Sequence, residues 1–227
     1  MNDLQRDLFL LADEGYRAFH GALVPTLPRE RLIGVRAPDL RRYAAAFAKT
    51  PGALPFLDEL PHEYYEENNL HGMLLDRVVK EHGELLLRLD AFLPFVDNWA
   101  TCDSLSFRLL RANREETLPH IERWLASPHV YTTRFAIVTL MKNYLDDCFP
   151  AHMPRRLAAM RTDEYYVNMA LAWYFAEALA KKPEAALPVL EEGLLDAWVH
   201  NKAIQKAGES RRVSPEWKAR VKALRIH

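Results

Sequence analysis

At five points along the 227-residue chain, an aromatic residue stands at the start of an apolar, helix-like segment. The spacings between these residues are 34, 32, 34 and 33 positions, and the residues are Tyr65, Trp99, Tyr131, Tyr165 and Trp198. A period of this length is typical of a repeated helix pair, because one pair alone cannot bury its apolar stripe. The sequence therefore predicts a stack of similar helical units.

Helical periodicity runs through much of the chain, whereas strand patterns are scarce. Prolines and capping residues mark several expected helix starts, among them Pro38 and the pair Ser214–Pro215. About a dozen helices in about six antiparallel pairs are expected, with boundary errors of ~2–4 residues. The predicted fold is an all-α, right-handed α-solenoid of HEAT-like helix pairs. No segment is long enough to be a linker, so residues 1–227 are expected to form a single domain.

The composition excludes several classes of protein. No apolar run approaches the ~20 residues that span a bilayer, and residues 1–19 are too charged for a secretory signal. Cys102 and Cys148 lack metal-like spacing, which favours a reduced, cytoplasmic setting with both as small buried residues. Neither a metal nor a nucleotide cofactor is expected, because the phosphate-loop and metal-binding motifs are missing. A monomer is expected.

Charge is divided unevenly along the chain. Residues 199–227 contain eight Lys or Arg against two Glu, whereas the other 198 residues carry 22 basic and 29 acidic side chains. A positive end on an acidic body is typical of a protein that anchors a polyanion. On composition alone, a solvated terminal helix is the safer interpretation.

The sharpest local feature is the segment Asp97-Asn-Trp-Ala-Thr-Cys-Asp103. On a helix, Trp99 and Asp103 lie on one face and one turn apart. An indole face beside a carboxylate makes a site for a cation. In the alternative interpretation, which the spacing alone favours, Asp97 is a helix N-cap, Trp99 fills the core and Asp103 is a surface residue.

Three residues after the repeated aromatic residues, four of the five side chains are polar and able to hydrogen-bond. A row of hydrogen-bonding groups, one per repeat, suits a groove that follows a sugar-phosphate backbone. The alternative is the solvated side of each helix. These residues are Asn68, Cys102, Arg134, Asn168 and Asn201. Trp173 lies in an apolar stretch, where core packing is the default interpretation.

Four segments resemble the HEAT-like repeat DNA glycosylases of the bacterial DNA alkylation repair family. The similarity extends from about Tyr16 to the end of the chain. Each motif alone is short, but four in order across one repeat architecture are fairly specific. The segments are Ile33–Arg41, Asp97–Asp103, Tyr131–Ile137 and Trp198–Lys206.

The resemblance implies excision of cationic alkylpurines, such as 3-methyladenine and 7-methylguanine, from double-stranded DNA without base flipping. By position, Trp99 and Trp173 would pack on the sugar of the damaged nucleotide. Asp103 would stabilise the developing oxocarbenium ion and orient water, and Arg134 would bind a phosphate. Further DNA contacts are expected from Asn168, Asn201, Lys202, Lys206, Arg211 and Arg212.

Two features depart from the pattern of active members. Ala176 stands where they carry a second arginine, one turn after the second tryptophan. Their minor-groove helix corresponds here to residues 21–29, where Pro25 and Pro28 disfavour a continuous helix. The chain therefore resembles a divergent branch that binds DNA weakly without excision. Three hypotheses remain: a glycosylase, a non-catalytic DNA-binding relative, and a protein-interaction scaffold.

Overall fold

The computed structural model describes residues 1–226, and among them the chain is all-helical. No strand occurs in this part, and a single isolated bridge joins Ala12 to Val35. It contains fifteen α-helices and two short 3-10 helices. The excess over a dozen comes from helices of four to six residues, too short to show a period. The chain divides into two compact units, Met1–Asn113 and Arg114–His227.

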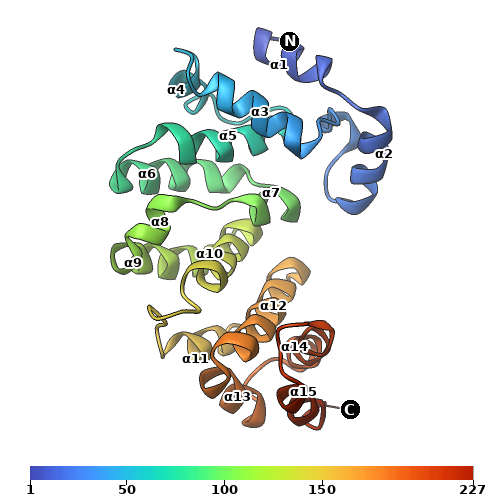
Figure 1. Cartoon of the computed structure of the whole chain (residues 1–227), viewed down its shortest axis with the longest axis vertical. Helices are drawn as coiled ribbons and strands as arrows, with labels where there is room; N and C mark the ends of the chain where they lie inside the picture. Colours follow the sequence, from blue (N-terminus) through green and yellow to red (C-terminus); the bar gives the residue numbers. More distant parts are fainter. Residues whose placement is uncertain (227) are drawn as a thin grey trace. The chain divides into compact units, whose positions relative to one another are not determined.

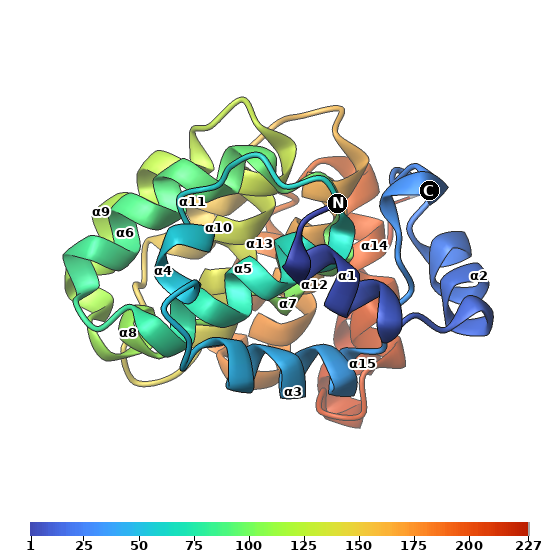
Figure 2. The ribbon, with the colours of Figure 1, turned by 90° about the horizontal axis from the view of Figure 1, so that it is seen from above.

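The first unit is built around α5, which contacts α3, α4 and α7, while α6 contacts α8. Helix α2 lies to one side of α3, α5 and α6 (Figures 1 and 2). Short 3-10 helices cover Arg29–Arg31 and Leu93–Phe95. The α-helices are α1 (Asp3–Leu10), α2 (Glu14–Leu23), α3 (Ala37–Phe47), α4 (Ala53–Phe56), α5 (Tyr65–Val78), α6 (His82–Phe92), α7 (Trp99–Ser104) and α8 (Arg108–Ala112).

The second unit has two layers of helices. Helices α10, α12 and α14 lie side by side, and α9, α11, α13 and α15 pack against them and one another (Figure 1). Its helices are α9 (Arg114–Leu125), α10 (Val130–Asn143), α11 (Met153–Ala158), α12 (Tyr165–Lys181), α13 (Pro183–Glu191), α14 (Ala197–Glu209) and α15 (Pro215–Lys222).

The aromatic period marks helix starts. Each of the five repeated aromatic residues is the first or second residue of α5, α7, α10, α12 or α14. Six residues later, every side chain is buried: in α5, α10, α12 and α14 this position lies one and two-thirds turns further along the helix, and after α7 it is the residue that follows the helix. These buried residues are His71, Leu105, Ile137, Leu171 and Ile204.

A buried carboxylate organises the loop before α3. Both oxygens of Glu66 accept hydrogen bonds from backbone N–H groups, at 3.0 Å from Ile33, 2.7 Å from Gly34 and 3.1 Å from Val35. Burial raises the pKa of Glu66, although these bonds act in the opposite direction. Gly34 has a φ of +99°, a conformation that side chains with a Cβ rarely adopt.

Two histidines form a buried pair in the first unit. Nε2 of His62 lies 2.9 Å from Nδ1 of His71, and each ring stacks on a phenylalanine. Burial lowers the pKa of His62 to about 4 and that of His71 to about 2. Both rings are therefore neutral near pH 7.

The two cysteines differ in exposure, and they do not form a disulfide with each other. Cys102 on α7 is buried, as expected. The expectation of burial was wrong for Cys148, which is exposed in the connection between α10 and α11, 3.1 Å from a guanidinium nitrogen of Arg114. No helix among residues 1–226 has the length and apolar character needed to cross a bilayer.

Candidate functional site

Helix α7 in the first unit carries Trp99 and Asp103 one turn apart. Both side chains are half-buried. The helix is capped by Asn98, whose side-chain oxygen accepts the Thr101 N–H at 2.8 Å. The assignment of Asp97 as the N-cap is therefore wrong.

Trp99 is held by the end of α2 and by the segment that follows it. Its indole Nε1 donates to the backbone oxygen of Leu23 at 3.1 Å. Its ring packs against the buried side chains of Val24, Leu27, Leu32 and Tyr65. The ring is thus fixed in place and remains partly open to solvent.

The segment around Pro25 and Pro28 has no continuous helix, in agreement with the sequence. Helix α2 ends at Leu23, and the next helical turn begins at Arg29. This segment is fastened close to α7, since Arg31 forms a 2.5 Å ion pair with Asp97. Nε of Arg31 also donates to the backbone oxygen of Glu63 at 2.9 Å.

In the second unit, Trp173 of α12 is half-buried rather than enclosed in the core. It lines an open hollow together with three basic residues that were predicted to contact DNA: Lys206, Arg211 and Arg212. Ala176 and the acidic residues Glu177 and Glu209 also line this hollow. The structure therefore brings together four of the predicted site residues.

The predicted polar row is largely engaged with the protein backbone. Arg134 is 6% exposed, and its Nη1 donates to the backbone oxygen of Tyr166 at 2.6 Å, which ties α10 to α12. The amide of Asn168 donates to the Thr162 oxygen, and that of Asn201 to the Ile226 oxygen. A role of these three residues in DNA contact stays a prediction. Asn68 and Cys102 are buried.

Sequence reasoning missed an exposed aromatic pair in the second unit. Tyr165 is 55% exposed and Trp198 is 41% exposed, with ring centroids 5.8 Å apart. Nζ of Lys202 lies 5.8 Å from the centre of the Trp198 ring. The repeat period placed both rings at helix starts but carried no signal for their exposure.

No group of three or more His, Cys, Asp or Glu within residues 1–226 is arranged to hold a metal ion. The candidate residues have carboxylate, indole, amide and basic side chains. Trp99 and Asp103 belong to the first unit, whereas Trp173, Arg134 and the basic residues belong to the second.

Comparison with known proteins bears on the chemistry these residues serve. The sequence profile described as DNA alkylation repair enzyme matches residues 8–213, which is nearly the whole chain. No curated protein and no solved structure gave a significant match. The matched range includes most of each compact unit and every candidate site residue. The chain therefore belongs to the DNA alkylation repair enzyme family.

Proposed function

We propose that this protein acts on alkylated double-stranded DNA as a glycosylase of the HEAT-like type. The observation that carries the proposal is the pairing of Trp99 with Asp103 on α7, in a chain whose family repairs alkylated DNA. The proposed substrates are cationic alkylpurines such as 3-methyladenine and 7-methylguanine. In this proposal the layered helices continue as a right-handed solenoid of about six pairs that follows the duplex.

The chemistry needs little from the protein. A positively charged alkylpurine is already a good leaving group, so no general acid is required. Asp103 stabilises the cationic sugar as the glycosidic bond breaks and orients the attacking water. Loss of one such electrostatic group often costs ~10²–10³-fold in rate. The indole faces of Trp99 and Trp173 add ~0.5–2 kcal/mol each of cation stabilisation.

The backbone of the duplex is held by basic side chains of the second unit. Arg211 and Arg212 are exposed, and Lys202 and Lys206 are half-buried. Each phosphate that such a cation neutralises releases counterions, so binding weakens as salt rises. Arg134, Asn168 and Asn201 are proposed to add further contacts to the duplex backbone.

A non-catalytic DNA-binding relative is the second candidate. Two observations favour it: the segment around Pro25 and Pro28 forms no helix, and Ala176 lies beside Trp173 at the position where the family resemblance expects a second arginine. In that case Trp99 and Asp103 are remnants of an active arrangement. A protein-interaction scaffold is the third candidate.

Release of 7-methylguanine and 3-methyladenine from methylated duplex DNA tests the proposal. Wild type is expected to release both, and Asp103→Asn to lower the rate at least ~10²-fold without loss of duplex binding. Asp163→Asn, a change at an exposed acid of the second unit, is the matched control and is expected to keep the wild-type rate.

Release no faster than in buffer would overturn the glycosylase proposal. Salt-dependent duplex binding without release would then favour the second candidate. The absence of duplex binding would leave the scaffold.

A further inference from the structure

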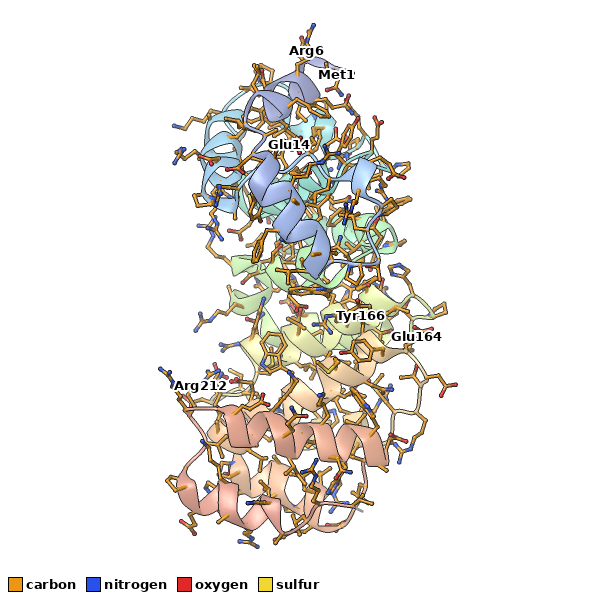
Figure 3. All side chains as sticks on the ribbon, turned by 90° about the vertical axis from the view of Figure 1, so that its right-hand side faces the viewer. Met1, Arg6, Glu14, Glu164, Tyr166 and Arg212 are labelled. Atoms are coloured by element: carbon orange, nitrogen blue, oxygen red, sulfur yellow. The ribbon has the colours of Figure 1, made fainter. Side chains whose placement is uncertain are left out.

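The hollow beside Trp173 contains a guanidinium group from outside α12. The side chain of Arg212 comes from the connection after α14, and one of its Nη atoms bonds to Oε1 of Glu177. Figure 3 labels Arg212 on this connection, with its side chain at the surface. Ala176 on α12 also lines this hollow, and because its side chain ends at Cβ it takes up little of the space beside the guanidinium.

The two partners of this ion pair differ sharply in exposure. The side chain of Glu177 is 11% exposed, whereas that of Arg212 is 63% exposed. A carboxylate this deeply buried needs a charged partner to offset its loss of hydration. A guanidinium has five N–H donors in a rigid fork, so the bond to Glu177 fixes its direction and leaves other donors facing solvent.

The backbone at Arg212 is also held on both sides. The Ser210 hydroxyl accepts the Arg212 N–H at 3.2 Å, and the next residue, Val213, is buried. Ser214 caps α15 by accepting the Trp217 N–H at 3.2 Å. A side chain on such a fixed connection loses little freedom when it binds a ligand.

The surroundings of Arg212 suit an anion next to a flat apolar group. Within residues 1–226, Lys206 and Arg211 have no ion-pair partner, so the hollow has two cations available besides Arg212. The indole of Trp173 offers the apolar face. A sugar joined to a phosphodiester combines these two properties.

We propose that Arg212 binds a phosphodiester of the nucleotide that lies on Trp173, and that Glu177 is a positioning residue that holds the guanidinium there. This inference rests on the proposed DNA-binding function. The inference gives Glu177 a favourable role in DNA binding, although the negative charge of a carboxylate by itself repels DNA.

The test compares Glu177→Met with Glu209→Met in duplex binding, measured by fluorescence anisotropy over a range of salt. Both changes remove one negative charge from the same hollow, but only Glu177 holds Arg212. Glu177→Met is expected to weaken binding about 3- to 10-fold, because Arg212 must then be ordered by the DNA. Glu209→Met is expected to bind as tightly as wild type or more tightly.

A double variant tests whether Glu177 acts through Arg212. In an Arg212→Ala background, Glu177→Met is expected to have no further effect on DNA affinity. Arg212→Ala alone is expected to reduce the slope of log affinity against log salt by about 0.9. Tighter binding by Glu177→Met, or additive effects in the double variant, would overturn the inference.

Unfolding must be separated from loss of binding. Thermal unfolding checks that each variant folds, and if Glu177→Met does not fold, Arg212→Lys decides. This change keeps the charge but removes the fork, and it is expected to weaken binding severalfold; unchanged binding would overturn the inference. If wild type binds no duplex, the proposed function fails together with the inference. If wild type binds and only the Glu177 prediction fails, the proposed function stands.

Discussion

Gly34 has a positive φ, which strongly favours glycine, and it lies in a loop whose backbone N–H groups donate to the carboxylate of Glu66. A Cβ at this position would lie 2.7 Å from Cβ of Arg17 and 2.9 Å from the backbone oxygen of Asp13. The Asp13 N–H also donates to the Gly34 oxygen at 3.0 Å. These contacts join the start of α2 to the loop before α3, so Gly34 controls how the loop meets α2.

Gly34→Ala is therefore expected to lower the free energy of unfolding by ~2 kcal/mol or more, from backbone strain and overlap together. Urea unfolding followed by circular dichroism measures it. Gly83→Ala is the matched control: it lies in α6 with no neighbour near its Cβ position and is expected to be neutral or stabilising by up to ~1 kcal/mol. Equal effects of the two changes would show that neither backbone strain nor overlap at position 34 destabilises the variant.

Helix α7 shows how a short element is stabilised from outside. Six residues are too few for an isolated helix to persist in water. Its order comes from the Asn98 cap and from the packing of Trp99 on the segment after α2. The orientation of Asp103 depends on both, because it lies one turn from Trp99 on the same helix.

Asn98→Ala is expected to destabilise the chain by ~1 kcal/mol, the usual cost of removing an N-cap. The effect is measured as a lower urea midpoint. Asn98→Ser keeps an acceptor at the cap and is expected to lose less than half as much. If serine and alanine cost the same, the cap does not stabilise α7.

The sequence predicted where helices begin better than it predicted which side chains contact one another. The aromatic period located the starts of α5, α7, α10, α12 and α14, because a buried stripe repeats with the helix. It could not distinguish Asp97 from Asn98 as the cap, since both residue types cap well. The bond of Glu66 to Gly34 and that of Arg212 to Glu177 join positions over 30 residues apart, which no local pattern encodes.

For the whole molecule, the distribution of charge matters more than its formal sum of -1. Two of the basic side chains near the C-terminal end pair with an acid, Arg212 with Glu177 and Arg220 with Glu191. Lys206 and Arg211 have no such partner among residues 1–226, so their charges are available to an external anion. The positive end predicted from composition is therefore only partly available for DNA.

The stability of the whole chain is expected to depend on pH through His62 and His71. Their pKa values are lowered by burial to about 4 and about 2, against an ordinary value of 6.5. Below pH 6.5 the two histidines become protonated in the unfolded chain but stay neutral in the folded chain. The free energy of unfolding is therefore greatest above pH 6.5 and falls as the pH drops toward 4. Urea midpoints at pH 7.5 and pH 5 measure this loss, and His71→Leu is expected to reduce it. An unchanged pH dependence in His71→Leu would exclude the pair as its source.

The unequal exposure of the two thiols has a practical consequence. Cys102 is sealed inside the first unit, whereas Cys148 is open to reagents in the second. A maleimide dye added to the folded wild-type protein therefore attaches at one defined place, with no cysteine removed or introduced. The resulting conjugate can be used in single-molecule experiments with the native sequence.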